Sequence, residues 1–315
     1  MDAPGKPKVD QAAASRAAGR TVPQLPPSGQ RMRVIIDSDA ATEIDDLYAI
    51  ALALLSPERF EIGGFVAAHY GDSGGPDGIS KSVTAIETIM DKAGLAGKLP
   101  VKPGSHPFRY SRVAEESEGV DFIIERAMAS DPKNPLWVVS LGPATNLASA
   151  WLKQPAIKDR MVAFWHGRTR WPKQAWNYNA YNDVKAVRIL FASDLPFVLF
   201  DTGTHLVCPM EESAQKIAPF GPLGRYLHEY RYRREWFQSP GKGFFDLGDI
   251  AALLDPACVK SEIVPAPSIE WDMTYLHDKP HGQLLRIHDI DRDRAFGLLF
   301  ERLASSESRG SEFRL

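Results

Sequence analysis

The chain contains the run Val34-Ile35-Ile36-Asp37-Ser38-Asp39-Ala40-Ala41-Thr42-Glu43-Ile44-Asp45-Asp46, in which a short apolar strand leads into five carboxylates. So many negative charges within ten residues repel one another strongly once they leave bulk water. Folded proteins tolerate such a group where a positive charge lies among the acids, commonly a divalent cation that prefers oxygen ligands. The run therefore predicts a cation-binding or catalytic site directly after a strand.

Helix capping accounts for only part of this run. Asp and Thr favour helix N-caps, and acidic side chains in a first turn complement the helix dipole. The apolar residues 47–55 that follow predict a buried helix, so one or two of the acids could serve it. Asp37 and Asp39 precede that helix at the end of the strand, and capping does not explain them.

Composition indicates a globular protein with a sizeable core. The chain has 315 residues, of which 44% are hydrophobic and 24% charged. The net charge of −3 gives no reason to expect a nucleic acid or a membrane surface as partner, and no apolar run is long enough to span a bilayer. Cys208 and Cys258 form neither a disulfide framework nor a zinc pattern, so we expect a reducing, cytoplasmic location.

The two ends of the chain differ from its middle. Residues 1–31 are rich in Ala, Pro, Gly and Gln, carry five basic and two acidic residues, and lack the apolar segment of a secretory signal. They predict a disordered extension. We expect one catalytic domain over residues 32–304 and a disordered polar tail over residues 305–315.

Apolar runs alternate with helical patterns along the domain. Strands are expected at 34–36, 62–68, 136–141, 161–165 and 197–200, and helices at 44–55, 79–93, 120–129, 144–152 and 183–191. Continuous apolar strands are typical of a parallel sheet covered on both faces. We therefore predict a single-domain, doubly wound α/β fold with a mostly parallel sheet flanked by helices. Beyond residue 204 the pattern becomes mostly helical, at 223–237 and 249–254, with short strands near 263–271 and 285–287.

Polar residues follow several of these strands. Ligands of open α/β sheets bind beyond the carboxyl ends of the strands. The five acids follow the first run, His69 follows the second, Leu141 opens a Gly-Pro turn after the third, and His166, Arg168, Asn177, Tyr178 and Asn179 follow the fourth. These groups predict one acid-rich rim with aromatic neighbours.

Five ordered blocks resemble those of a known family. They are the strand ending in Asp37-Ser38-Asp39 with Asp45-Asp46; Val138–Asn146; Asn177-Tyr178-Asn179 with Asp183; Phe200–His205; and Gly248-Asp249-Ile250-Ala251 with Asp255-Pro256. In this order, over about residues 33–256, they resemble the inosine–uridine-preferring nucleoside hydrolases. The resemblance implies a small-molecule riboside as substrate and a homodimer or homotetramer.

The resemblance also implies a calcium ion at the floor of the pocket. Its ligands would be Asp39, Asp46, Asp249 and the backbone carbonyl of Leu141, and Asp39 would also be the general base that activates water. Asp45 and Asn179 would bind the ribose hydroxyls as the sugar approaches an oxocarbenium-like transition state. Asn177 stands where the family has a Glu.

The chain departs from the family on the leaving-group side. Five residues, 40–44, separate Asp39 from Asp45 where the family usually has three, and Gly248 stands where many members have a His that protonates the base. Glu43, His69 and Trp236 are candidate substrate contacts. Each has an ordinary alternative, as a helix cap, a hydrogen-bonded histidine or part of an amphipathic helix. The basic and aromatic mixture of that helix, residues 223–237, could also stack a base or meet a phosphate.

Two further interpretations remain open at this point. A calcium-dependent riboside-binding protein that has lost turnover would explain the missing His and Glu. A phosphatase of the haloacid dehalogenase type also opens with a strand and Asp-x-Asp, with Asp37 as nucleophile, although Ala41 stands where that motif has Thr or Val.

Overall fold

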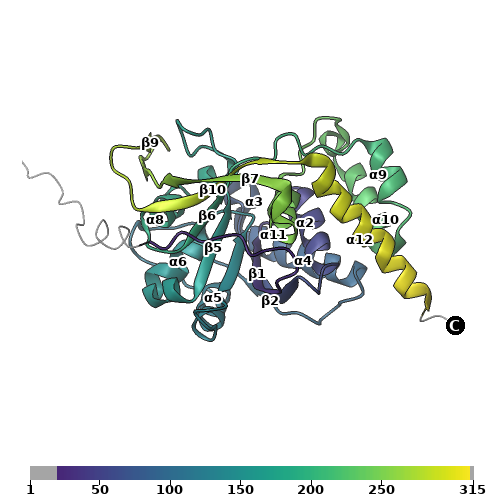
Figure 1. The fold of residues 1–315 in the computed structure, drawn as a ribbon, viewed down its shortest axis with the longest axis horizontal. Helices are drawn as coiled ribbons and strands as arrows, with labels where there is room; N and C mark the ends of the chain where they lie inside the picture. Colours follow the sequence, from purple (N-terminus) through teal and green to yellow (C-terminus); the bar gives the residue numbers. More distant parts are fainter. Residues whose placement is uncertain (1–19, 313–315) are drawn as a thin grey trace, which may run out of the picture.

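A computed structural model describes residues 20–312, which form one eight-stranded sheet between two layers of helices (Figure 1). The strand order is β3 (Val101–Pro103), β2 (Phe60–Ala67), β1 (Met32–Ser38), β4 (Leu136–Ser140), β5 (Met161–His166), β6 (Phe197–Phe200), β10 (Gln283–Ile290) and β7 (Val259–Pro265). Neighbouring strands are parallel except the last pair. The predicted doubly wound, mostly parallel α/β fold is confirmed.

Helices cover both faces of the sheet. α5 (Glu118–Met128), α6 (Thr145–Lys153) and α8 (Val184–Ala192) lie on one face, and α2 (Asp45–Leu54), α4 (Gly78–Lys92), α10 (Gly221–Tyr230), α11 (Phe245–Leu254) and α12 (Arg292–Glu312) lie on the other (Figure 1). Successive strand residues point to opposite faces, so Ile36 packs with the second layer and Ile35 with the first. The remaining elements are α3 (Gly71–Gly74), α7 (Tyr178–Asn182), α9 (Met210–Lys216), the small sheet β8 (Ser268–Ile269) with β9 (Tyr275–Leu276), and 3₁₀ turns at Gly75–Asp77, Pro155–Asp159, Arg231–Arg233, Glu235–Gln238 and Pro256–Cys258.

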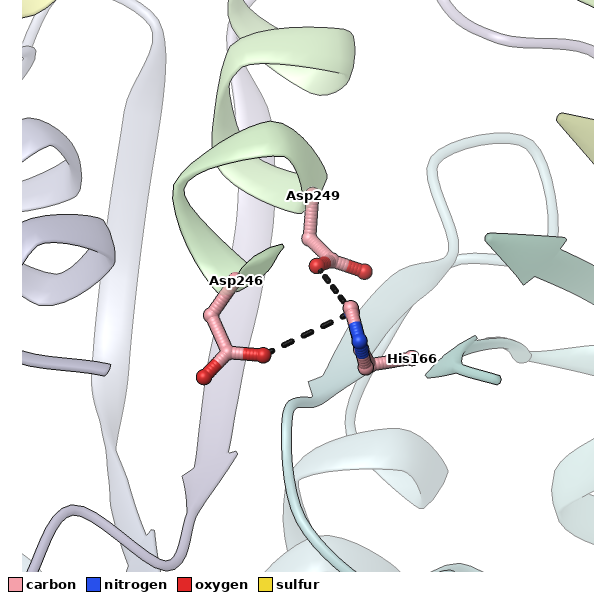
Figure 2. A group of neighbouring side chains, drawn as sticks. All are labelled: His166, Asp246 and Asp249. Atoms are coloured by element: carbon pink, nitrogen blue, oxygen red, sulfur yellow. Dashed lines mark hydrogen bonds and ion pairs between the residues drawn. The ribbon is translucent and has the colours of Figure 1, made fainter. Parts of the chain in front are cut away.

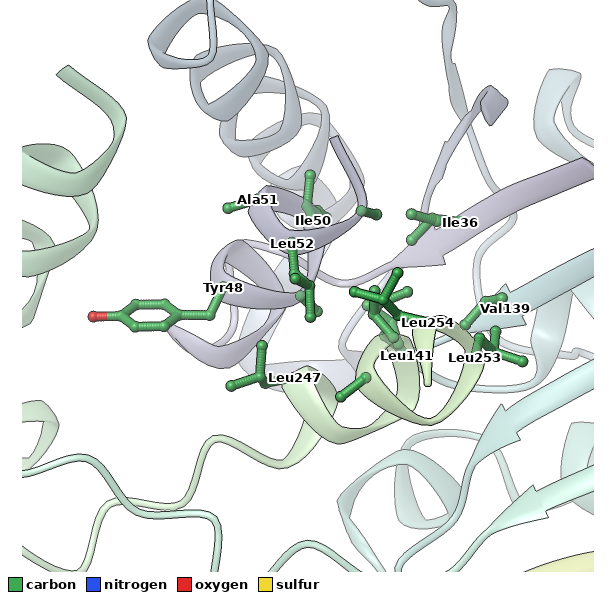
Figure 3. Packing of buried hydrophobic residues seen from close by; sticks show 14 of the residues in the cluster. Ile36, Tyr48, Ile50, Ala51, Leu52, Val139, Leu141, Leu247, Leu253 and Leu254 are labelled. Atoms are coloured by element: carbon green, nitrogen blue, oxygen red, sulfur yellow. The ribbon is translucent and has the colours of Figure 1, made fainter. Parts of the chain in front are cut away.

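The helices α2 and α11 pack against each other and cover the sheet. Every residue of α2 is buried, and its Ile50 and Leu52 pack with Leu253 and Leu254 of α11 over β1 and β4 (Figure 3). Burying a side chain of this size contributes about 1.5–3 kcal/mol. Both helices begin at the carboxyl edge of the sheet, so their amino-terminal ends meet there.

Two helical predictions and the predicted carboxyl-terminal tail differ from the structure. The helix expected over 223–237 ends at Tyr230, because Arg231 turns inward and donates to the backbone oxygens of Phe237 and Cys208 at 3.1 and 2.8 Å. The helix expected from residue 249 begins at Phe245. α12 was not predicted, and it continues beyond residue 304 into the segment expected to be a disordered tail; residues 313–315 lie outside the described part.

The structure describes only the second part of residues 1–31, the segment predicted to be a disordered extension. Residues 1–19 of the predicted extension lie outside the described residues. Residues 20–31, predicted to be disordered, are instead attached to the domain. Arg20 is buried and donates to the carbonyl of Phe191 at 2.8 Å, and Arg59 donates to the carbonyls of Pro26 and Pro27 at 2.8 and 2.7 Å. Within residues 20–312, no helix is both long and apolar enough to cross a membrane.

Candidate active site

An acidic pocket of about 70 Å³ opens at the carboxyl ends of β1, β4 and β5. It lies beside β1 and β4, where the strand order reverses and open α/β sheets bind their ligands. Five carboxylates line it, from Asp39, Glu43, Asp45, Asp46 and Asp246, together with Thr42, Leu141, His166, Arg168, Asn177, Tyr178, Asn179 and Phe245. The structure thus brings together seven of the predicted site residues, namely Asp39, Glu43, Asp45, Asp46, Leu141, Asn177 and Asn179, with three residues of the predicted rim, His166, Arg168 and Tyr178.

Asp39 is held by a tight turn after β1. Thr42 donates its backbone N–H to the Asp39 carbonyl at 2.8 Å and its hydroxyl to Asp39 Oδ2 at 2.9 Å. Gly142 leaves room for this carboxylate, because a Cβ there would lie 2.8 Å from Asp39 Oδ1. Burial, and then repulsion from Asp46, raise the pKa of Asp39 well above its usual value. Such a carboxyl resists ionisation unless a positive charge is nearby.

Asp45 and Asp46 form the first turn of α2 and face different partners. Ser38 donates to Asp46 Oδ1 at 2.5 Å, and the first backbone N–H of α11, on Phe245, donates to Asp45 Oδ2 at 3.1 Å. Asp45 thereby joins the start of α11 to the start of α2. Burial, followed by repulsion from Asp45, raises the pKa of Asp46 to about 7.

The acid that α11 contributes to the pocket is Asp246. Carboxylate oxygens of Asp45, Asp46 and Asp246 lie within 4.8 Å of one another. Burial, and then the charges of Asp46 and Asp45, raise the pKa of Asp246 well above its usual value. Among the described residues, this group is one of two His/Cys/Asp/Glu clusters close enough to share a metal ion, and the other is His166 with Asp246 and Asp249.

Asp249, predicted as a metal ligand, does not line the acidic pocket. Asp249 lies one turn further along α11, is fully buried and does not line the cavity; its Oδ2 accepts from His166 Nδ1 at 2.6 Å (Figure 2). His166 Nδ1 also lies 3.4 Å from Asp246 Oδ1. The physical reason is that α11 begins at Phe245, so the first-turn acid is Asp246 and the next turn reaches the end of β5 instead.

The resemblance implies that position 248 has lost a catalytic His, but the residue of α11 that lines the pocket before Asp246 is residue 245, one turn earlier. Gly248 is buried, and a Cβ on it would lie 2.6 Å from the Phe200 ring and 2.8 Å from Leu206, so no larger side chain fits there. Phe245, directly before Asp246, lines the pocket instead. The Arg168 guanidinium lies 4.3 Å from the centre of the Phe245 ring. Gly248 therefore has no room for a histidine and does not line the pocket.

Two asparagines of the loop after β5 reach the pocket. Asn179 Nδ2 donates to the Leu141 carbonyl at 2.6 Å and to the His166 carbonyl at 3.3 Å. Asn177 caps α7, since its Oδ1 accepts from the Ala180 N–H at 2.9 Å while its Nδ2 donates to the Ala175 carbonyl at 3.0 Å. Asn177 is thus largely engaged by backbone groups.

Lys242 is the main residue that sequence reasoning missed. Its side chain is 1% exposed, and Nζ lies 2.7 Å from Glu43 Oε2 and 3.2 Å from Asp45 Oδ1. Burial disfavours its charge, but the carboxylates of Asp45 and Glu43 outweigh burial and raise the pKa of Lys242. No local pattern marks Lys242, because its partners are almost 200 residues away in the sequence. Asp246 and Phe245 of the pocket were missed as well, whereas His166, Arg168 and Tyr178 belong to the rim predicted from their position after β5.

Two candidate substrate contacts lie outside the acidic pocket. His69 accepts from the Gly71 N–H through Nδ1 at 3.1 Å, so its Nε2 donates to Thr145 Oγ1 at 2.7 Å, and Thr145 donates to Asp183 at 2.8 Å. Burial lowers the pKa of His69 to about 4. Trp236 packs on Phe237 with ring centres 4.6 Å apart. The structure therefore places neither His69 nor Trp236 on the pocket wall.

The phosphatase interpretation requires an accessible Asp37, which the structure does not provide. Asp37 is fully buried and accepts from Asn146 Nδ2 at 2.9 Å and Ser140 Oγ at 3.1 Å. It does not line the pocket. Asp37 thus fixes the ends of β1 and β4 rather than facing a substrate.

The acidic pocket has the composition of a site for a hard cation. Lys242 pairs with Glu43 and Asp45, and His166 lies beside Asp246 and Asp249. Among the described residues, no cationic side chain forms an ion pair with Asp39 or Asp46. Several buried carboxylate oxygens together with the Leu141 carbonyl form the kind of oxygen-rich group that hard divalent cations prefer.

Comparisons with known proteins agree with this architecture. The pyrimidine-specific ribonucleoside hydrolase RihB of Shigella flexneri is 27% identical over 202 residues, which cover 60% of this chain and 61% of that protein; RihB of Escherichia coli O1:K1 matches with the same figures. The chain thus spans less than two thirds of these relatives. Two solved structures share the fold. The plant nucleoside hydrolase PpNRh1 has a TM-score of 0.69 and 21% identity, and the match covers 87% of this chain and 99% of that one. A purine-preferring ribonucleoside hydrolase from Gardnerella vaginalis has a TM-score of 0.68 and 21% identity, and the match covers 88% of this chain and 99% of that one.

A family model gives the broadest match. The model described as inosine-uridine preferring nucleoside hydrolase matches residues 34–295, from β1 into α12. This range includes every residue of the acidic pocket. The chain belongs to the inosine–uridine preferring nucleoside hydrolase family.

Proposed function

We propose that the chain is a calcium-dependent hydrolase of an N-ribosidic bond, which converts a riboside and water to ribose and a free base. The observation that carries this proposal is the convergence of Asp39, Asp45, Asp46 and Asp246 in one buried pocket on this family's fold. Buried carboxylates without cationic partners are unfavourable unless an ion joins them. A family that cleaves ribosides supplies the reaction for such a site.

Asp39, Asp46, Asp246 and the Leu141 carbonyl are the groups that would hold the ion. Asp246 replaces Asp249 in this set, because only Asp246 lines the pocket. A bound calcium ion supplies positive charge that makes water at the site easier to deprotonate. Asp39, fixed by Thr42 and backed by Gly142, then accepts the proton of the attacking water.

Asp45 and Asn179 are suited to bind the ribose. Asp45 accepts hydrogen bonds from the Phe245 N–H and from Lys242 Nζ, which fix its carboxylate. Asn179 of α7 donates to the Leu141 carbonyl. Hydrogen bonds to sugar hydroxyls that strengthen as the ring flattens lower the barrier to an oxocarbenium-like transition state.

The leaving-group side offers little acid catalysis. Phe245 lines the pocket directly before Asp246, and the one histidine on the pocket wall, His166, already hydrogen-bonds Asp249 through Nδ1. Among the described pocket residues, no histidine therefore stands at the Phe245 position to protonate the base. We infer that the natural leaving group departs with little protonation.

The test is ribose release in calcium buffer from p-nitrophenyl riboside and from a panel of common nucleosides. Nitrophenolate departs without a proton, so this substrate probes the sugar and ion side alone. Calcium-dependent release from p-nitrophenyl riboside is expected, with slower release from the nucleosides. Tight calcium and riboside binding with no release from any substrate would favour the riboside-binding protein instead.

A further inference from the structure

A second cavity of opposite charge adjoins the acidic pocket. This basic groove, of about 650 Å³, is lined by Lys81, Arg233, Arg234, Tyr70, Tyr226 and Tyr230, together with small and hydroxyl-bearing residues of α4. Three cationic side chains and no carboxylate line it, whereas five carboxylates line the acidic pocket. A ligand that spans both cavities would therefore contact cationic side chains in the groove and carboxylates in the acidic pocket.

The two cavities share a wall. Ala41 lines the groove while Thr42, its neighbour, lines the pocket. Ser73 of the groove and Tyr178 of the pocket join their hydroxyls at 2.6 Å. Burial raises the pKa of Tyr70, and smaller opposing effects come from Asp39 and Arg234, so this groove tyrosine lies within reach of charges on both sides. The groove is therefore the adjacent space for whatever part of a riboside the pocket does not hold.

Size supports the same arrangement. Small-molecule sites commonly have about 300–1,000 Å³, a range that the pocket alone does not reach and the groove does. A ribose reaching the acids leaves its base or its 5′ end in the groove. The Tyr226 and Tyr230 rings, with centres 5.7 Å apart, offer an aromatic wall there.

The groove arginines are available for a ligand. Both are exposed, and within the described residues no carboxylate lies in ion-pair contact with Arg233, Arg234 or Lys81. The Arg233 guanidinium lies 4.3 Å from the centre of the Tyr230 ring, a stacked position that leaves its N–H edges free. Arg231, by contrast, is buried and bonded to backbone oxygens. Arg231 therefore has a structural role, whereas Arg233 and Arg234 line the groove.

We propose, on the basis of the hydrolase function above, that the substrate is an anionic riboside whose phosphate or carboxylate binds Arg233, Arg234 and Lys81 while its sugar lies in the acidic pocket. Guanidinium groups bind both anions through paired N–H donors. A nucleoside 5′-monophosphate carries the charge on the sugar, and orotidine carries it on the base. Each is an anionic riboside that uridine matches without the charge.

Calorimetric titration of the full chain in chelator, at low ionic strength, tests the groove independently of turnover. The probes are uridine, uridine 5′-monophosphate and orotidine. At least one anion should bind ~10-fold or more tightly than uridine, as expected for hydrogen bonds to a charged group. Which of the two anions gains identifies where the substrate carries its charge.

The variant Arg233→Gln/Arg234→Gln should lose this preference for the anion, while Arg225→Gln should retain it. Arg225 is a matched control because it lies exposed on α10 and does not line the groove. Equal binding of all three probes, no binding of any, or a preference that survives the double substitution would overturn the anionic-riboside proposal. Release of ribose from p-nitrophenyl riboside in calcium is measured separately, so the hydrolase proposal stands or falls on its own result.

Discussion

Lys242 Nζ lies 2.7 Å from Glu43 Oε2, joining the segment between Asp39 and Asp45 to the residues that open α11. The same ammonium lies 3.2 Å from Asp45 Oδ1 and 5.1 Å from the centre of the Phe245 ring. One buried cation therefore balances two of the five pocket acids and holds the starts of α2 and α11 together. Glu43, one of the residues that lengthen this segment relative to the family, is paired by a lysine rather than serving as a helix cap.

Removing Lys242 should destabilise the protein strongly. Lys242→Met leaves Glu43 and Asp45 as neighbouring acids without their cation, and breaking a buried pair from one side typically lowers the free energy of unfolding by about 3–5 kcal/mol. Denaturant unfolding measures the loss. Adding Glu43→Gln should restore part of it, because one uncompensated charge disappears. An exposed pair, Lys260 with Asp289, provides the control: Lys260→Met should leave stability nearly unchanged. Equal stability of Lys242→Met and wild type would refute this role.

Substitutions of Asp246 and Asp249 should differ in how much they weaken calcium affinity. Asp246→Asn removes a charge from the pocket, and since affinity for calcium depends on ligand charge, binding should weaken by about 100-fold or more. Asp249→Asn changes a carboxylate that faces His166 instead, so its effect on calcium affinity should be smaller. Calorimetric titration of both variants with calcium makes the comparison. A greater loss in Asp249→Asn would return Asp249 to the ligand set.

The sequence predicted the first strand and helix because both carry strong local signals. An apolar run ends in acids, and an uninterrupted apolar helix follows, as the structure confirms for β1 and α2. The choice between Asp246 and Asp249 lacked such a signal. The two acids are three residues apart and lie on one helix face, so only the start of α11 at Phe245 decides which one reaches the pocket.

Other features depend on contacts distant in sequence. Lys242 finds its partners across the fold, and no spacing rule connects residues so far apart. The segment beyond residue 304 looked polar, yet Phe296, Leu299 and Leu303 hold α12 against the core and the helix continues past them. Arg231 ended a predicted helix because its side chain is drawn inward to two carbonyls. Tertiary contacts overrode the local pattern in each case.

The stabilising effect of calcium should grow with pH. Asp46 and Glu43 have pKa values raised to about 7, mainly by burial and then by Asp45, and the pKa values of Asp39 and Asp246 are raised as well. Without the ion, the folded state binds more protons than the unfolded state between about pH 4 and 7, so these acids lower stability as pH rises through that window. Calcium favours the ionised acids and reverses the loss.

Melting temperatures with and without calcium at pH 5 and pH 8 test this dependence. The calcium-induced rise in Tm should be larger at pH 8. His69, with its pKa lowered to about 4 by burial, acts in the opposite sense below pH 6.5, but it affects both conditions and cancels in the difference. A calcium effect that is larger at pH 5 would contradict the assignment of these acids to the ion.

Phe245 is the position at which base protonation could be restored. Phe245→His places an imidazole on the pocket wall beside Asp246, and general acid catalysis contributes about 10²–10⁴-fold where the donor is well placed. Ribose release from common nucleosides should rise, by an amount limited by how well the new donor is aligned. Release from p-nitrophenyl riboside should gain nothing, because nitrophenolate needs no proton.

The matched comparison for that variant is Gly248→His. Its Cβ would lie 2.6 Å from the Phe200 ring, so the protein should unfold at a lower temperature rather than gain activity. A gain in nucleoside hydrolysis from Gly248→His, without one from Phe245→His, would show that the leaving group lies on the other side of α11.

The most direct test of the catalytic calcium site compares wild type with Asp39→Asn on p-nitrophenyl riboside. In calcium, wild type should release nitrophenolate, and chelation should stop it. Asp39→Asn should remain folded by its Tm and lose activity by about 10²–10⁴-fold, because the proton of the attacking water has lost its acceptor. Full activity of Asp39→Asn, or full activity of wild type in chelator, would contradict the assignment of this acidic pocket as a calcium-dependent catalytic centre.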